Sequence, residues 1–189
     1  YNLIDEITLL DGNAIIHYGQ TILEGGLIET DLKNNIVKSK IKYSILPSVK
    51  TETQPPTYGD YMKFDLITET GNITNGYNEI DMGIFKGDNF FTNKNEDVYI
   101  DHGMFTSCDH PDPHYYFGSR QMKVDHSSSQ IIAKPMTLYI QDLPTFSLPF
   151  AILPNSNQNR KSGFMMPAFG HNKDTGTWIQ DLGYYYAPN

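Results

Sequence analysis

Residues 58–76 read YGDYMKFDLITETGNITNG and hold two short runs of β-forming residues on either side of a polar turn. In the first run Met62, Phe64 and Leu66 alternate with charged residues, as in a strand with one apolar and one polar face. A turn-forming stretch at 70–72 follows, and an apolar run restarts at Ile73. The segment therefore predicts a β-hairpin with one face in a core.

The same order of features occurs at two other places in the chain. An aromatic residue and a glycine (18–19 and 117–118) precede a strand-like run, a polar turn and a second strand-like run. A stack of such hairpins buries one face of each unit against its neighbours. The repeat predicts an elongated, open β-jelly roll or a β-solenoid built of antiparallel hairpins.

Two further segments, 40–43 and 136–141, alternate in the same way and predict strands. Clusters of Gly, Asn, Asp and Ser residues are interpreted as the turns between strands. These clusters are Asp11-Gly12-Asn13, Lys33-Asn34-Asn35, Thr70-Gly71-Asn72, Asn75-Gly76, Lys86-Gly87-Asp88-Asn89, Asn93-Lys94-Asn95 and Ser127-Ser128-Ser129.

The composition favours sheet over helix and excludes several classes of function. Isoleucine (19) outnumbers leucine (13), and Thr and Asn reach 15 each in 189 residues, so the fold class is all-β. The net charge of −8, without a basic run, argues against nucleic acid as a partner. No apolar stretch is long enough for a transmembrane helix. The first residues lack a signal-peptide pattern, so any secretion signal is expected to have been removed or to lie outside this segment.

The composition of the sequence changes at Pro144, where prolines begin to interrupt the apolar and aromatic residues. Four prolines punctuate the region to Pro167, which predicts an extended connector with a boundary near residues 154–162. Beyond it, an apolar run at 164–166, a polar turn and an aromatic strand ending in tyrosines 184–186 resemble a membrane-barrel hairpin. They fit the edge of a soluble sheet nearly as well.

Four separated motifs resemble one known family, the LptD (OstA) family of outer-membrane lipopolysaccharide (LPS) assembly proteins. They are DVYI at 97–100 continuing through TSC at 106–108 and YYF at 115–117, LPTFSLPF at 143–150, RKSGFMMP at 160–167, and YYYAPN at 184–189. Residues 1–96 share only the loose repeat pattern of that family.

The resemblance implies a domain order and a function. Residues 1–154 would be a periplasmic β-jelly-roll domain, 155–163 a connector, and 164–189 the first strands of an outer-membrane β-barrel. The jelly roll would accept LPS from an LptA-like bridge joined by edge-strand addition and pass it to a barrel that holds an LptE-like plug lipoprotein. The implied location is the outer membrane of a Gram-negative bacterium, with this segment mostly periplasmic, and no cofactor is expected.

The alternation pattern and the resemblance together give the candidate site residues. Eight apolar residues are the candidates for a groove that holds acyl chains: Ile28, Met62, Phe64, Leu66, Ile73, Met122, Leu138 and Ile140. From the resemblance, Cys108 would form a disulfide with a cysteine outside this chain. Pro167 would weaken the first barrel strand at a lateral gate, and Gly183 stands where the family has a second proline.

Other functions rest on weaker patterns. The Cys108–His114 segment, with His102 and His126, offers donors for a metal, but their spacing matches no standard zinc module, so no metal site is predicted. Acidic pairs such as Asp65 and Glu69 resemble glycosidase carboxylates, yet no catalytic motif is present and no enzyme is predicted.

The remaining alternatives concern binding. Aromatic strands could stack on sugars, and Lys38, Lys40, Lys42 and Lys50 could meet lipid phosphates or simply face solvent. The alternative proteins are a soluble periplasmic LptA-like bridge and an extracellular carbohydrate-binding β-sandwich or solenoid.

Overall fold

The computed structural model describes residues 7–52, 54–80, 83–95, 97–125, 127–128, 130–154, 163–165, 168–172, 176–180 and 183–186, and within them it is all-β, as predicted. The strands are β1 (Ile7–Tyr18), β2 (Thr21–Asp31), β3 (Ile36–Lys40), β4 (Ser48–Thr51), β5 (Thr57–Tyr58), β6 (Tyr61–Asp65), β7 (Thr70–Ile80), β8 (Gly83–Thr92), β9 (Val98–Thr106), β10 (Tyr115–Asp125), β11 (Gln130–Lys134), β12 (Met136–Ile140), β13 (Leu143–Leu148), β14 (Ala151–Pro154), β15 (Gly163–Met165), β16 (Ala168–Asn172), β17 (Gly176–Gln180) and β18 (Gly183–Tyr185). Among these residues there is no helix long and apolar enough to cross a membrane.

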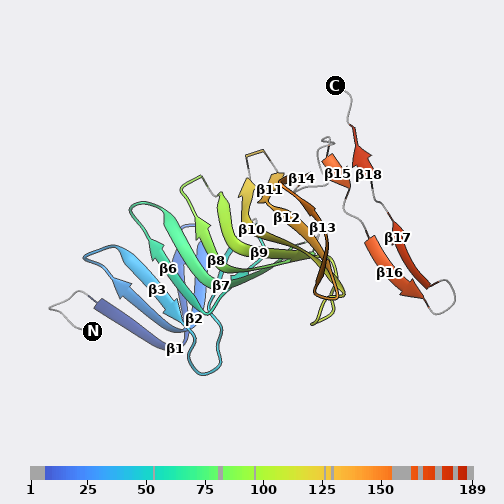
Figure 1. Cartoon of the computed structure of the whole chain (residues 1–189). Coiled ribbons are helices and arrows are strands. Elements are labelled where there is room, and N and C mark those ends of the chain that lie inside the picture. Colours follow the sequence, from blue (N-terminus) through green and yellow to red (C-terminus); the bar gives the residue numbers. More distant parts are fainter. Residues whose placement is uncertain are drawn as a thin grey trace.

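The first fourteen strands form one antiparallel sheet that divides into two arms (Figure 1). Six long strands, β1, β2 and β7 to β10, run through both arms. Shorter strands then occupy one arm each. The half of β2 near Asp31 pairs with β3 while the half near Thr21 pairs with β4. In the same way, one half of β10 pairs with β11 and the other half with β12.

We call the arm that contains β3, β6, β11 and β14 the first arm, and the arm that contains β4, β5, β12 and β13 the second arm. Because β6 and β5 both pair with β7, the strands β2, β3, β6, β7, β5 and β4 close into a ring of six. Beyond this ring the sheet continues through β8, β9 and β10, and it then ends in two separate edges, β14 and β13.

Three predicted hairpins are confirmed: β2–β3, β6–β7 and β10–β11. Each turn is closed by the aspartate that ends its first strand. Oδ1 of Asp31 accepts a hydrogen bond from the backbone N–H of Asn34 at 2.9 Å, and Asp65 does the same for Thr68 at 3.0 Å. Asp125 accepts from the N–H of Ser128 at 2.9 Å. This is the local Asx-turn chemistry that makes aspartate favourable at turns.

Several predicted turns are wrong, because they lie inside strands. Asp11-Gly12-Asn13 is a bulge within β1, and Asn75-Gly76 and Lys86-Gly87-Asp88-Asn89 lie in the middle of β7 and β8. Thr70-Gly71-Asn72 begins β7, since the turn itself occupies 66–69. These glycines mark places where a strand bends or another chain segment approaches closely, which is the other common role of glycine in sheets.

Two strand predictions also need correction. The alternating segment 40–43 is not a strand, because β3 ends at Lys40 and both Tyr43 and Ser44 have positive φ values of 52° and 60°. The segment from Pro144 to Pro154 is not a connector, since β13 and β14 pair in the sheet. Pro144 is tolerated because β13 is an edge strand, where one side of the backbone has no ladder partner.

The C-terminal residues form two small sheets. β16 pairs with β17, and β15 pairs with β18, so that Phe164 lies opposite Tyr184 and Met165 opposite Gly183. The predicted gate residue Pro167 lies outside the described residues, as does the connector 155–162.

Candidate functional site

An uninterrupted row of buried side chains crosses the first arm. Residues that face one another in successive strand pairs make up this first row, from β1 to β14: Leu10, Ile28, Ser39, Met62, Ile73, Phe90, Ile100, Met122, Ala133 and Ala151. All but Leu10, which is partly buried, are at most 4% exposed. Their neighbours one residue away, such as Lys63 and Asn72, are exposed, so the arm has one apolar face and one polar face.

A second row of cross-strand partners crosses the second arm, in which Leu23, Phe85, Phe105 and Phe117 are buried and most other members are partly buried. Its members, from β1 to β13, are Ile16, Leu23, Val49, Thr57, Asn78, Phe85, Phe105, Phe117, Leu138 and Phe146. The rings of Phe85 and Phe105 lie 4.6 Å apart. Buried residues of both rows belong to one hydrophobic cluster, so the apolar faces of the two arms pack toward each other.

The space between the two arms is not completely filled. A cavity of about 450 Å³ lies between the first-row residues Ile73 and Phe90 and the second-row residues Leu23 and Val49. This volume is within the range of small-ligand sites. Phe64 and Leu66 also line the cavity, and polar residues of the strand ends, including Gln20 and Lys94, lie at its border.

A smaller cavity of about 90 Å³ continues along the same interior toward β10, with Phe85, Ile100 and Val124 in its wall. The two cavities share five lining residues: Gln54, Pro55, Thr57, Phe90 and Val98. Beyond the smaller cavity, Phe105, Phe117, Ile131 and Leu153 fill the interior. The arrangement is therefore a groove with open space from β1 as far as the β9 and β10 residues that wall the smaller cavity, and it is filled by side chains beyond them.

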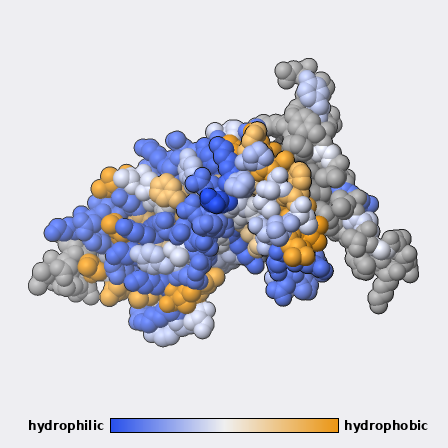
Figure 2. Space-filling model, viewed as in Figure 1, coloured by the Kyte–Doolittle hydropathy of each residue, from blue (hydrophilic) through white to orange (hydrophobic). Residues whose placement is uncertain are grey.

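Apolar side chains become exposed again at the end of the sheet near β13. Phe146, the last residue of the second row, is 58% exposed, and Leu143 is 68% exposed. Phe150 and Ile152 are exposed close by in sequence, and Figure 2 shows hydrophobic surface gathered over this end. The apolar interior thus reaches the surface at the strands that precede the C-terminal hairpins.

All eight predicted groove residues lie in the hydrophobic cluster or pack against it. Phe64, Leu66 and Ile73 come together around the larger cavity. Ile28, Met62 and Met122 are buried in the first row, whereas Leu138 and Ile140 lie partly buried in β12 of the second arm. The role of these residues in holding a ligand stays a prediction.

The alternation pattern in the sequence did not predict most residues of the second row, including Leu23, Val49, Phe85 and Phe105. Phe85 lies before Lys86-Gly87-Asp88-Asn89, and assigning these residues to a turn cut β8 in two.

The remaining predicted residues lie away from the groove residues. Cys108 is half-buried in the loop after β9, is not in a disulfide, and has its Sγ 3.5 Å from Nδ1 of His114. Gly183 pairs with Met165 in the C-terminal sheet. The described residues contain no group of three or more His, Cys, Asp or Glu side chains that could hold a metal.

The lysines that were considered for lipid phosphates are mostly paired with carboxylates. Nζ of Lys38 lies 2.7 Å from Glu29, that of Lys42 lies 2.6 Å from Asp11, and that of Lys50 lies 3.1 Å from Glu24. Hydrogen bonding to Glu29 raises the pKa of Lys38, and hydrogen bonding to Asp11 raises the pKa of Lys42. These pairs fit a solvated, charge-balanced outer face better than a phosphate site.

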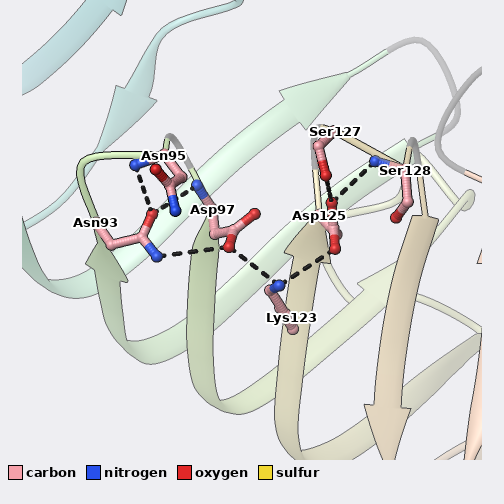
Figure 3. Close-up of polar contacts among 7 residues, drawn as sticks. All are labelled: Asn93, Asn95, Asp97, Lys123, Asp125, Ser127 and Ser128. Carbon is pink, nitrogen blue, oxygen red and sulfur yellow. Dashed lines mark hydrogen bonds and ion pairs between the residues drawn. The ribbon is translucent and has the colours of Figure 1, made fainter.

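A polar network ties the strand ends of the first arm together beside the groove (Figure 3). Lys123 bridges Asp97 at 3.0 Å and Asp125 at 3.2 Å. Asn93 accepts hydrogen bonds from the backbone N–H groups of Asn95 and Asp97. The N–H of Ser128, then the hydroxyl of Ser127 and the Lys123 ammonium, hold the pKa of Asp125 far below its ordinary value. The network fixes the β8–β9 and β10–β11 turns relative to each other.

The fold and the groove define a class: an all-β protein with an apolar interior between two sheet arms. Comparison with known proteins narrows this class. A family model described as LptD protein matches residues 131–189. LPS-assembly protein LptD of Hahella chejuensis is 27% identical over 187 residues, covering 95% of this chain and 22% of the relative. The Bordetella avium protein of the same name is 25% identical over 96% of this chain, and the Legionella pneumophila (strain Paris) protein is 31% identical over 50%.

The chain is thus similar to LPS-assembly proteins of this name over nearly its whole length, and its residues 131–189 match the LptD family model. It spans about a fifth of the length of the curated relatives that it matches.

Proposed function

We propose that this chain is the LPS-receiving part of an outer-membrane LPS-assembly protein. The two arms would form a β-jelly roll whose groove holds the acyl chains of lipid A while the sugars stay in water. The observation that carries the proposal is the pair of apolar rows, which run across ten strands each and meet an open cavity at one end. Each buried CH₂ of an acyl chain contributes about 0.8 kcal/mol, so such a groove can hold a lipid in water.

The proposal includes a direction of transfer. LPS would enter near β1, whose outer edge has no strand partner among the described residues, and leave near β13 and β14. A free edge accepts another strand by β-augmentation, so β1 is the proposed docking site for an LptA-like bridge. Residues 1–154 would be the periplasmic domain and 155–163 the connector.

Residues 164–189 would begin the barrel, with an LptE-like plug as the partner of the complete barrel. Within that hairpin, Pro167 and Gly183 are the proposed residues of a lateral gate. The proposed location is the outer membrane of a Gram-negative bacterium. A disulfide between Cys108 and a cysteine outside this chain is part of the same proposal.

Photo-crosslinking tests the groove directly. A benzoylphenylalanine probe at Phe64, which lines the larger cavity, is expected to capture LPS, while the same probe at the adjacent Lys63 faces outward and gives little product. Equal capture at both positions, or none at Phe64, contradicts the proposal. If free sugars compete for binding and lipid A does not, the chain is a carbohydrate-binding module instead.

A further inference from the structure

The segment Gln54–Thr57 lies at the junction between the two cavities. Gln54, Pro55 and Thr57 line both of them, opposite Phe90 and Val98 of the first arm. Pro55 is exposed. An acyl chain that moves along the groove from the larger to the smaller cavity therefore has to pass this segment. We call residues 54–57 the strap.

One side chain of the second row contacts three successive residues of the strap. Nδ2 of Asn78 donates to Oγ1 of Thr57 at 2.9 Å, and it lies 3.2 Å from the carbonyl oxygen of Pro56 and 3.4 Å from that of Pro55. The backbone of the strap joins the sheet at the short strand β5, where Thr57 and Tyr58 pair with β7 on one side and with β4 on the other. Prolines have no N–H to donate, so Pro55 and Pro56 can be anchored only through their carbonyl groups.

An amide is unexpected at position 78 if packing alone decides the residue. Its neighbours in the second row on the β8, β9 and β10 side are Phe85, Phe105 and Phe117. An apolar residue there would extend the aromatic row but would leave the carbonyl groups of the strap without a donor from β7.

We propose that Asn78 is a positioning residue that latches the strap across the groove and controls the passage of acyl chains between the two cavities. This inference rests on the proposed function, because it describes how the same groove is regulated. With the latch closed, a ligand stays in the larger cavity. When an acyl chain moves toward the smaller cavity, the Asn78 amide gives up its hydrogen bonds to the strap, and the strap moves aside.

The test compares LPS capture at two positions in the full chain. A benzoylphenylalanine probe at Phe64 reports on the larger cavity, and one at Phe85 reports on the smaller cavity. The Asn78→Ala substitution is expected to raise the ratio of Phe85 product to Phe64 product about fivefold, the factor that corresponds to roughly one hydrogen bond. Asn72→Ala, on the exposed face of the same strand, is the matched control and should leave the ratio unchanged.

Two further measurements keep the outcomes distinct. Pro56→Gly loosens the strap without altering β7, and it should raise the ratio of Phe85 product to Phe64 product even if Asn78→Ala fails to fold. If a probe at Phe85 perturbs the core, a probe at Val124 reports on the smaller cavity in its place. If LPS is captured at Phe64 but neither variant changes the ratio, the latch is wrong and the proposed function stands. If no probe position captures LPS in the chain that keeps Asn78 and Pro56, the proposed function fails and the latch fails with it.

Discussion

The backbone of Gly76 in β7 lies directly against the ring of Phe90 in β8: a Cβ atom on Gly76 would be 2.6 Å from Cδ1 of Phe90. The same relationship recurs on the next strands, where Gly87 approaches Ile100 and Gly103 approaches Met122. In each case a first-row side chain occupies the space that a Cβ atom on the preceding strand would need. These glycines lie where the long strands pass from one arm into the other, so the bend and the core packing depend on them together.

The first prediction follows from this contact. Gly76→Ala should lower the free energy of unfolding by about 1–3 kcal/mol, because a rigid aromatic ring has to move to admit the methyl group. Urea denaturation measures the change, with Asn72→Ala as the control in the same strand. A double variant with Phe90→Leu should lose less than the sum of the two single changes. Wild-type stability of Gly76→Ala would contradict the close contact.

The second prediction separates structural from lining residues. Met62 is fully buried, so Met62→Ala should cost about 2–5 kcal/mol of stability. Leu66 is only partly buried and lines the larger cavity, so Leu66→Ala should cost clearly less but weaken LPS capture at Phe64. Thermal unfolding and crosslinking are measured on the same samples. A larger loss of stability in Leu66→Ala than in Met62→Ala would mean that Leu66 is a core residue and does not line a cavity.

The third prediction concerns a buried hydroxyl in the first row. Oγ of Ser39 is fully buried and has no hydrogen-bond partner among the described residues, so Ser39→Ala should be neutral or stabilise the fold by up to about 1 kcal/mol. Thr106 is the control, since it is equally buried but donates to the carbonyl oxygen of Tyr115 at 2.7 Å. Thr106→Ala should destabilise by about 1–3 kcal/mol. Similar losses in both variants would refute the distinction.

The fourth prediction is a pH dependence. Because hydrogen bonds lower the pKa of Asp125 in the folded state, its stabilising contribution is complete above the unfolded value near 3.8 and is lost as the pH falls toward the folded value. Asp125→Asn should therefore be less stable than the wild type at pH 7, and the gap should shrink below about pH 4. Urea midpoints from pH 7 to pH 3 measure it. Asp109→Asn, in the exposed loop after β9, should show no such gap.

The fifth prediction tests the proposed disulfide. In this chain Cys108 is a half-buried free thiol and should react with a maleimide without unfolding. In a longer protein that carries the proposed partner cysteine, the same thiol should be protected until a reductant is added. Non-reducing electrophoresis of the longer protein should show a mobility shift that Cys108→Ser abolishes. An unprotected Cys108 in the oxidised longer protein would rule the disulfide out.

The sequence identified the all-β class and three hairpins because alternation and turn chemistry are local properties. The aspartates 31, 65 and 125 close their turns through backbone groups only two or three residues away. Met62 and Phe64 were assigned to the inner face for the same reason, since one strand already shows which residues share a side.

Apart from the alternating strand β12, the second arm could not be predicted in this way. Asn75-Gly76 has the composition of a hairpin turn, but β7 continues through it because β8 pairs with it on both sides of the glycine. Whether a glycine reverses a strand or bends it depends on partners that are distant in the sequence. Likewise, β5 contains only Thr57 and Tyr58, and its place in the second row is set by β4 and β7 rather than by its own residues.

The continuous cross-strand register of the two rows limits how such a chain can vary in length. One residue inserted within a strand would reverse the inward and outward sides of everything beyond it until the next bulge, and would break both rows at that strand. The bulge at 11–13 shows how β1 absorbs an irregularity without disturbing the pairing on either side. Insertions and deletions among natural variants should therefore accumulate in the hairpin turns and in segment 41–47, and spare the ladder itself.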